Sequence, residues 1–347
     1  MPSSSNPPPH GIYVPVPTFF KDDKSSIESY SSPPLDLETQ AEHSLFLVRG
    51  GVKSLVILGS TGEAIHVSDK ERIDLIKSSR ETLDKEGFTD RPIVAGTATQ
   101  SVEQTVEQLR TAKEAGAAYG MVLAPGYFAP AASQEGITKF FQAVAHQSPI
   151  PIMIYHYPGV TNGLSISPST FETLAAHPNI VGCKLSHFAM DDHTLIAASP
   201  NIDHEHFATF TGLGQQLLPV LTVGGAGAID GLAGVFPRTV VRLYNLYHDT
   251  TVSSKVSKAD IDAIRLLQWR ICRGEKLVAK WGVVGVKEAL ARCWGMGGKE
   301  NARLPLAGGL QGGEKEWAAW DDVFADLKKG EEDLKRRDEE KGVNGSK

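Results

Sequence analysis

Short apolar runs alternate with longer amphipathic stretches from residue 11 to about residue 250 of this 347-residue chain. Eight of the runs are apolar at consecutive positions, a pattern typical of parallel strands that are covered on both faces. Each run is therefore interpreted as one strand of a buried sheet. The predicted strands lie at residues 11–19, 54–59, 92–98, 119–125, 150–158, 180–186, 207–212 and 226–234.

The stretches between these runs carry the residues that start helices. Ser68 with Glu71 and Ser101 with Gln104 each fit a capping box, and Pro168 fits a first helical position. Eight strand–helix units in about 240 residues predict an α/β fold of the (β/α)8 (TIM) barrel type. An open doubly wound sheet is the alternative, and it is less favoured because eight evenly spaced units close more naturally than they fan out.

Three segments stand outside this alternation. Residues 1–10 are predicted to be a disordered tail, and the catalytic barrel is expected to span residues 11–250. Residues 21–34 are polar and rich in serine and proline, so we expect a surface loop at the active-site end, either an inert insertion or a lid. Residues 251–347 are predicted to form appended helices whose charged end is partly disordered.

Composition narrows the classes of function. A net charge of −6 without a basic block argues against nucleic-acid binding, and no apolar run approaches the roughly 18–20 residues needed to cross a bilayer. Cys183, Cys272 and Cys293 lack CxxC spacing and fit a reduced compartment. The opening residues lack the apolar core of a signal peptide and the arginines of a mitochondrial presequence, so a cytoplasmic location is expected.

Lys184 interrupts the apolar run at residues 180–186. Burying an unpaired ammonium costs several kcal/mol or more, so such a lysine usually loses its proton or snorkels to water. Catalytic groups of a barrel lie at the carboxyl ends of its strands, where this residue falls. With the ordinary lysine pKa of about 10.4, only about one side chain in 2500 is neutral at pH 7. With a pKa lowered to about 7 to 8, about a tenth to half of the side chains would be neutral. Lys184 is therefore predicted to be an amine nucleophile that forms a Schiff base with a ketone.

Other reactive groups are expected at neighbouring strand ends. Tyr155 ends the fifth predicted strand and is an acid/base candidate, with a simple packing role as the alternative. The turn at residues 59–63 (GSTGE) offers the hydroxyls of Ser60 and Thr61 and backbone N–H groups suited to an anion, although an ordinary loop would look the same. The HEH triplet at residues 204–206 precedes the seventh strand, at the opposite end of the barrel, and is not expected to bind a metal.

With Lys184, Tyr155 and the GSTGE turn in this order, the sequence resembles the dihydrodipicolinate synthase / N-acetylneuraminate lyase family of pyruvate-dependent class I aldolases and lyases. The likeness covers about residues 11–240. It implies that Lys184 forms the Schiff base with pyruvate or another 2-oxo acid and that Tyr155 relays protons. No metal or organic cofactor is required by this scheme.

The resemblance also implies the remaining site residues. Ser60 would complete the proton relay and, with Thr61 and Gly62, hold the pyruvate carboxylate, while Ile229 would contact the substrate. Tyr127 matches a tyrosine that, in this family, reaches into the neighbouring subunit's site. A homodimer or homotetramer is therefore expected.

One position departs from the family pattern. Val160 stands five residues after Tyr155, where dihydrodipicolinate synthases carry an arginine for the carboxylate of the incoming aldehyde. The stretches at residues 147–167 and 177–186 look closest to 4-hydroxy-2-oxoglutarate aldolases and 2-keto-3-deoxy-L-galactonate aldolases. The sequence thus predicts an aldolase that splits a 4-hydroxy-2-oxo acid into pyruvate and an aldehyde. A metal-dependent aldolase and a non-catalytic barrel that binds a 2-oxo acid remain as alternatives.

Overall fold

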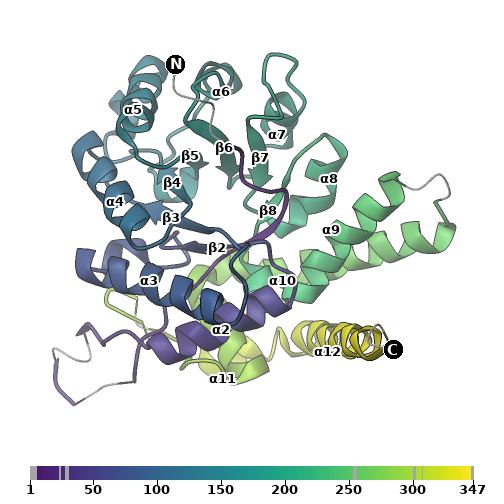
Figure 1. Cartoon of the computed structure of the whole chain (residues 1–347). Coiled ribbons are helices and arrows are strands. Elements are labelled where there is room, and N and C mark those ends of the chain that lie inside the picture. The colour runs from purple at the N-terminus through teal and green to yellow at the C-terminus, as the bar shows by residue number, and fades with distance from the viewer. Residues whose placement is uncertain are drawn as a thin grey trace.

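A closed barrel of eight parallel strands forms the centre of the molecule, each strand pairing with the next and the last with the first (Figure 1). This computed structural model describes residues 6–22, 25–27, 31–252, 256–299, 302–306 and 308–344. The (β/α)8 prediction is confirmed, and the open-sheet alternative is wrong. The strands are β1 (Gly11–Pro15), β2 (Ser54–Ile57), β3 (Ile93–Thr97), β4 (Tyr119–Leu123), β5 (Ile152–His156), β6 (Ile180–Leu185), β7 (Ala208–Thr211) and β8 (Gly227–Ile229).

The strands are apolar throughout because both of their faces are buried. Side chains such as Val56, Met121 and Phe210 fill the barrel interior. Outward side chains such as Leu55 and Ile154 join a second, larger cluster that the helices cover. The predicted strands run past the observed ones, because the apolar sequence continues into the loops at the carboxyl ends.

Helices surround the barrel, one after each strand (Figure 1). They are α2 (Leu37–Arg49), α3 (Asp69–Lys85), α4 (Val102–Glu114), α5 (Gln134–Gln147), α6 (Pro168–Ala175), α7 (Met190–Ala197), α8 (Leu217–Thr222) and α9 (Pro237–Val252). Short 3₁₀ turns lie in the loops at η1 (Ala64–His66), η2 (Ala129–Ala131), η3 (Pro158–Val160), η4 (Gly214–Gln216) and η5 (Leu232–Gly234).

Helices α3, α4 and α6 begin at the positions that the sequence predicts from their capping residues. Ser68 and Glu71 form both bonds of a capping box at α3. At α4, Ser101 accepts a hydrogen bond from the Gln104 N–H, which is one half of the predicted box. Pro168 is the first residue of α6. These caps satisfy N–H groups that have no partner inside their own helix.

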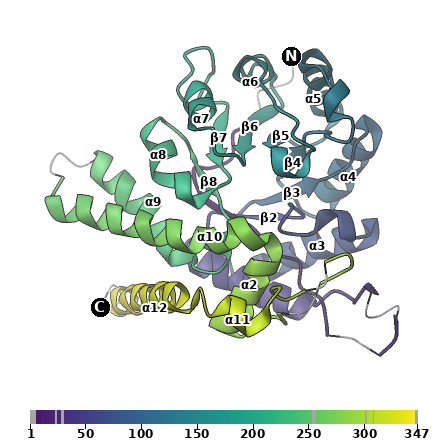
Figure 2. The same ribbon diagram turned by 180° about the vertical axis from the view of Figure 1, so that it is seen from behind.

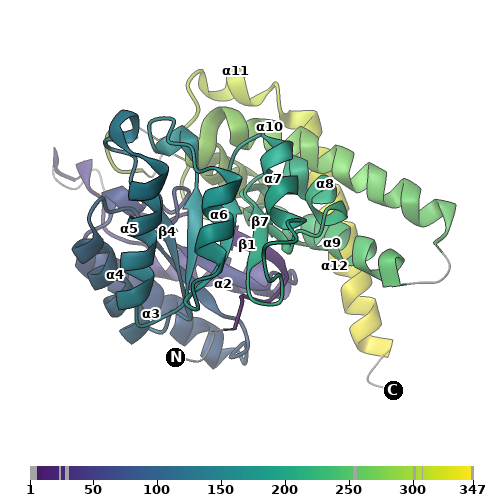
Figure 3. The ribbon, with the colours of Figure 1, turned by 90° about the horizontal axis from the view of Figure 1, so that it is seen from above.

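Three further helices follow the barrel, namely α10 (Lys258–Trp294), α11 (Gly313–Trp317) and α12 (Asp321–Asn344). Helix α10 packs against α9 and α12 and passes in front of the barrel in Figure 2. Figure 3 shows α9, α10 and α12 together on one side of the barrel. Arg270 donates two hydrogen bonds to Asp326, of 3.1 and 3.0 Å, which join α10 to α12. Gly282 breaks the helical conformation of α10 with a φ of 54°.

Several predicted tail and loop residues lie outside the described residues, namely 1–5, 23–24, 28–30 and 345–347. Within the described part of the N-terminal tail, the Pro7 carbonyl accepts a hydrogen bond from the Tyr119 hydroxyl. The ends of the loop at 21–34 meet through the Lys21 N–H and the Pro34 carbonyl at 2.9 Å. None of the described helices combines the length and apolar character that crossing a bilayer requires.

Candidate active site

The register between β5 and β6 turns Lys184 toward the barrel interior. Ile152 pairs with Ile180 but Met153 pairs with Gly182, so β6 carries one extra residue at this point. An extra residue reverses which face the following side chains occupy. Lys184 consequently pairs with Tyr155 and lies on the interior side, with its Nζ 4.4 Å from the centroid of the Tyr155 ring.

Gly182 makes this irregular register possible. A Cβ at this position would lie 2.5 Å from the carbonyl oxygen of Ala208 on β7, closer than real Cβ contacts allow. Glycine lets the two backbones approach at the bulge. The position of Lys184 therefore depends on the glycine two residues before it.

The Lys184 side chain lies in a dry environment at the end of β6. It is 4% exposed, so the amine does not snorkel to bulk water. Burial lowers the pKa of Lys184 to about 7, although the Asp230 carboxylate opposes this shift. About half of such amines would be neutral and nucleophilic at pH 7.

Tyr155 and Ser60 form a hydrogen-bonded pair beside the amine. Their hydroxyl oxygens are 3.2 Å apart. Burial raises the pKa of Tyr155 to about 12, and hydrogen bonds to Ser60 and Ser186 reduce this effect. Tyr155 is therefore a neutral phenol near pH 7 that can accept one proton while it donates another.

The turn after β2 presents part of the predicted anion-binding nest. The N–H groups of Gly62 and Glu63 donate to carbonyls within the turn, at 3.0 and 3.1 Å. Among the described residues, no acceptor meets the N–H of Ser60 or Thr61. These two N–H groups and the two hydroxyls are thus what the turn can offer to a carboxylate.

Gly62 has a packing role beneath this turn. A Cβ there would lie 3.0 Å from the Leu58 Cα and N. The Gly62 carbonyl accepts a 2.6 Å hydrogen bond from the Thr18 hydroxyl. Gly62 therefore packs on the side of the turn that contacts Leu58 and Thr18, and it does not line the cavity beside Lys184.

A cavity of about 350 Å³ opens at the carboxyl ends of the strands. Its lining includes Ser60, Thr61, Tyr155, Lys184 and Ile229, five of the residues predicted for the site. Val160 contributes to the same wall and also to an adjoining cavity of about 210 Å³ that extends along β3. Helix α10 closes another side with apolar residues and Glu275.

Tyr127 lies apart from this cavity. It follows β4, is 71% exposed, and packs edge-on against the exposed Phe128 with ring centroids 4.8 Å apart. It does not line the cavity that contains Lys184. The predicted role of Tyr127 therefore requires a second subunit.

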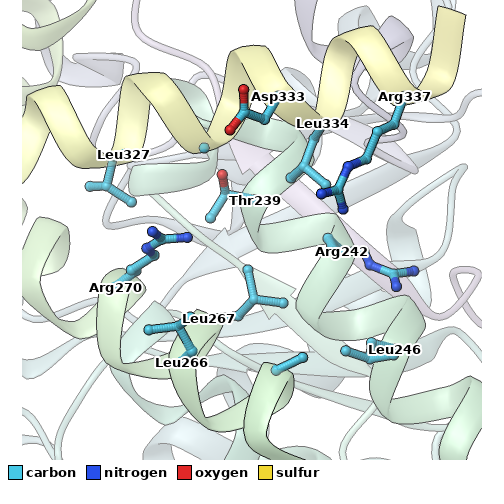
Figure 4. A pocket seen from close by; sticks show the side chains of 12 residues that line it. Thr239, Arg242, Leu246, Leu266, Leu267, Arg270, Leu327, Asp333, Leu334 and Arg337 are labelled. Carbon is cyan, nitrogen blue, oxygen red and sulfur yellow. The ribbon is translucent and has the colours of Figure 1, made fainter. Parts of the chain in front are cut away.

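A separate cavity of about 230 Å³ lies between α9, α10 and α12 (Figure 4). Leucines form much of its lining, and its charged groups are Arg242, Arg270, Asp333 and Arg337. Figure 4 shows Arg242 and Arg337 on one side and Arg270 on the other. This cavity contains no counterpart of the amine and phenol found at the strand ends, so the chemistry is assigned to the cavity beside Lys184.

The histidines of the HEH triplet contact backbone carbonyls. Nε2 of His204 lies 2.9 Å from the Ser199 oxygen, and Nε2 of His206 lies 3.2 Å from the His177 oxygen. In the part of the chain that the structure describes, no three His, Cys, Asp or Glu side chains are arranged to hold a metal ion.

Sequence reasoning missed several polar groups near the site. Glu63 forms a buried ion pair with Lys287 of α10. Asp230 and Glu275 are fully buried carboxyl groups on the loop after β8 and on α10. Lys287 and Asp230 each interrupt an apolar run, as Lys184 does, so the same signal could have found them.

The closed barrel with a buried lysine at a strand end has the architecture of a (β/α)8 barrel enzyme. The chain belongs to the dihydrodipicolinate synthetase family, whose model matches residues 32–316. Together with the relatives described next, this shows that the protein is an aldolase of that family, a carbon–carbon lyase, as the sequence predicts.

Two fungal relatives are similar to most of the chain. A protein of Emericella nidulans named "Probable 4-hydroxy-2-oxoglutarate aldolase, mitochondrial" is 34% identical over 287 residues, which cover 83% of this chain and 86% of that protein. The L-threo-3-deoxy-hexylosonate aldolase of Hypocrea jecorina is 33% identical over 295 residues, which cover 84% and 88%.

Solved structures show the same fold. A dihydrodipicolinate synthase family protein from Coccidioides immitis matches with a TM-score of 0.76 at 30% identity, covering 93% of this chain and 98% of that one. A prophage protein of this family from E. coli K12, solved in complex with pyruvate, matches with a TM-score of 0.73 at 25% identity, covering 94% and 98%.

Proposed function

We propose that this protein is a class I aldolase that cleaves a 4-hydroxy-2-oxo acid into pyruvate and an aldehyde through a Schiff base at Lys184. The observation that carries the proposal is the dry amine of Lys184, with its pKa lowered to about 7, beside the phenol of Tyr155 in a cavity at the strand ends. A neutral amine with access to a cavity can attack a ketone carbon.

The reaction begins when the Lys184 nitrogen attacks C2 of the 2-oxo acid. Uptake of a proton and loss of water give a positively charged iminium. The C4 hydroxyl proton then passes to Tyr155 while Tyr155 releases its own proton to Ser60, which the 3.2 Å separation of their oxygens permits. Ser60 gives up its own proton in the same step, through the partner subunit's Tyr127 to solvent. The C3–C4 bond breaks, the iminium accepts the electron pair as an enamine, and protonation and hydrolysis release pyruvate.

The substrate carboxylate is proposed to bind at the turn after β2. Ser60 and Thr61 line the cavity together with Lys184, and their N–H groups and hydroxyls are suited to an anion. Ile229 on β8 supplies an apolar wall. The pyruvate complex of the E. coli relative supports pyruvate as the common product.

The aldehyde half of the substrate has two candidates. The name of the Emericella relative supports 4-hydroxy-2-oxoglutarate, which carries a second carboxylate. The Hypocrea relative supports a 3-deoxy sugar acid, which carries hydroxyls instead. Lys184 is the only cation that lines this cavity within the described residues, and Val160 stands on its wall, which favours a neutral, hydroxylated half over a second carboxylate. Aspartate semialdehyde is disfavoured for the same reason, because Val160 offers no cation to its carboxylate.

Borohydride trapping tests the Schiff base. The purified protein is incubated with pyruvate and sodium borohydride, and peptide mass spectrometry is expected to find the reduced adduct on Lys184. Lys184→Ala should show neither adduct nor turnover on a panel of 4-hydroxy-2-oxo acids. An enzyme that loses activity with EDTA and forms no adduct would be a metal-dependent aldolase, and a protein that binds but never turns over any acid would be a non-catalytic barrel.

We also propose a homodimer or homotetramer in which Tyr127 of the partner subunit completes the proton relay. The 71% exposure of Tyr127 beside the equally exposed Phe128 supports a contact surface there. Co-expression of Lys184→Ala with Tyr127→Phe should restore about a quarter of the wild-type activity, because about half of all dimers would be mixed and each mixed dimer would contain one intact site out of two. A monomer by light scattering, or no restoration, would refute this arrangement.

The cytoplasmic location stays a prediction. Relatives in Emericella nidulans and Coccidioides immitis carry the word mitochondrial in their names. Fractionation of cells that express the full chain with a C-terminal tag decides between the two compartments.

A further inference from the structure

Two buried carboxyl groups lie side by side next to the cavity. Asp230, directly after β8, and Glu275, on α10, are 0% and 2% exposed. Glu275 is hydrogen-bonded to Asp230, and burial together with the Asp230 charge raises the pKa of Glu275 well above its usual value. Glu275 therefore holds a proton more strongly than an ordinary glutamate does, as expected when two carboxyl groups share one buried site.

The Asp230 carboxyl group lies close to Lys184. A Cβ at Gly212 would lie 3.0 Å from Lys184 Cε, and one at Gly214 would lie 3.0 Å from Asp230 Oδ1. The short loop after β7 thus separates the amine from the carboxylate. Glu275 lines the same cavity as Lys184, and the Asp230 charge is strong enough to act on the titration of the amine.

The surroundings leave Asp230 as the source of negative charge on this side of the site. The titratable groups around Lys184 are Tyr155 from β5, Tyr157 just after it on the wall of the same cavity, Asp230 from the loop after β8 and Glu275 from α10, with Cys272 next to Glu275. Burial raises the pKa values of Tyr155 and Glu275, so both groups lose their protons less readily than they would in water. Asp230 Oδ1 is buried, and among the described residues no N–H group and no serine, threonine or tyrosine hydroxyl donates to it, so the carboxyl group of Glu275 is the hydrogen-bond partner available to it.

We propose that Asp230 is the ionised member of this pair and Glu275 the protonated one, and that Asp230 is a positioning residue that provides a fixed counter-charge for the iminium formed at Lys184. The inference rests on the proposed Schiff-base function. A neutral amine, a ketone and one proton from solvent combine to give the iminium and one water molecule, so the dry site gains one positive charge. A fixed carboxylate nearby stabilises that charge without donating the proton itself.

A purely structural role for the pair makes a different prediction. Asp230 Oδ2 accepts the Ala233 N–H and Glu275 Oε1 accepts the Leu232 N–H, each at 3.1 Å, at the start of η5. Amides keep these acceptors. Asp230→Asn and Glu275→Gln therefore preserve the same hydrogen bonds, but only the first removes the charge, since Gln mimics the protonated Glu that is already present.

The test compares these two matched variants in the full-length protein. An opposite charge near a titratable group shifts its pKa by about 1–3 units, so Asp230→Asn should lower the adduct trapped at a fixed subsaturating pyruvate concentration at least about tenfold. The acid limb of its kcat/KM profile should move to lower pH by about one unit, because the free amine loses the neighbour that favours its protonation. Glu275→Gln should stay within about threefold of wild type in both readouts.

Three outcomes separate the ideas. If wild type forms no adduct at Lys184, the proposed function fails. If wild type forms the adduct, and Asp230→Asn forms as much adduct and has the acid limb of its kcat/KM profile at the same pH, the proposed counter-charge is refuted while the aldolase mechanism stands. If both amide variants lose the same activity and melting temperature with unmoved pH profiles, the pair is structural and the inference is overturned.

Discussion

The buried ion pair between Glu63 and Lys287 connects the anion-binding turn to α10, and its removal is the sharpest test of how the turn is held. The two side chains are 1% and 5% exposed, and the Lys287 amine also lies 4.6 Å from the centroid of the Phe20 ring. Lys287→Met removes the charge but keeps the length of the side chain. It leaves the Glu63 carboxylate buried without its cation.

Breaking one partner of a buried pair costs about 3–5 kcal/mol, because the remaining charge stays desolvated. With about 2.1 cal/mol/K of unfolding entropy per residue, this loss lowers the Tm of a chain of this length by roughly 4–7 °C. The turn next to Glu63 presents Ser60 and Thr61, so we also expect the KM for the 2-oxo acid to rise about fivefold, the value of one weakened hydrogen bond.

A double-mutant cycle separates the pair from its surroundings. Differential scanning calorimetry and steady-state kinetics are run on Lys287→Met, Glu63→Gln and the double variant. The double variant should be less destabilised than the sum of the single variants by at least about 1 kcal/mol, since it contains no unpaired charge. An additive cycle, or a Tm change below about 1 °C for Lys287→Met, would refute the reasoning.

Three further predictions follow from single observations. The kcat/KM for cleavage should rise as pH increases through about 7, the lowered pKa of Lys184, and a profile that is flat from pH 6 to 8 would contradict the neutral amine. Gly182→Ala should cost about 1–3 kcal/mol by urea denaturation, because its Cβ would meet the Ala208 oxygen, whereas Gly136→Ala on α5 should cost little; equal effects would contradict the bulge argument. Burial lowers the pKa of His43 to about 4, so the folded state binds fewer protons than the unfolded state and stability should be full above pH 6.5 and decrease toward pH 4. His43→Gln should reduce the loss in the free energy of unfolding between pH 6.5 and pH 4 by about 3 kcal/mol. If this variant loses as much stability over that range as wild type does, the lowered pKa of His43 is contradicted.

The barrel could be predicted because its signals are local. The order and type of the elements are indicated by eight continuous apolar runs and by caps such as Ser68 and Pro168. Because crossovers between parallel strands are right-handed, few arrangements of these elements remain. Strand ends were less exact, because residues just past each strand are as apolar as those within it.

The orientation of Lys184 could not be predicted. Simple alternation from Val181, which faces the interior, would point Cys183 inward and Lys184 outward, yet Cys183 packs in the outer cluster. The extra residue in β6 reverses this, and only the register with β5 reveals it. Gly182 was the visible signal, since an isolated glycine in a strand marks a bulge or a close backbone approach.

The carboxyl pair and the Glu63–Lys287 pair were missed for a different reason. Each joins residues that are distant in sequence, such as Asp230 and Glu275, and no spacing rule connects a barrel loop to a helix appended after the barrel. Their chemistry depends on burial and mutual distance, which emerge only when α10 packs over the strand ends. Sequence could show that a charge interrupts an apolar run, but it could not show which partner the charge would meet.

The two buried lysines illustrate what assigns a function to such a residue. Lys184 and Lys287 both interrupt apolar runs, both are buried, and burial lowers the pKa of each. They differ in their neighbours. Lys287 contacts the Glu63 carboxylate directly and does not line the cavity, so its charge fixes the turn. Lys184 faces an aromatic ring and an open cavity, and the Asp230 carboxyl group lies beyond the loop after β7. In the proposed mechanism its lone pair is therefore free to reach a substrate, and the iminium would still have a counter-charge nearby. The placement of the carboxylate, rather than the burial of the amine, therefore distinguishes the proposed nucleophile from the structural cation.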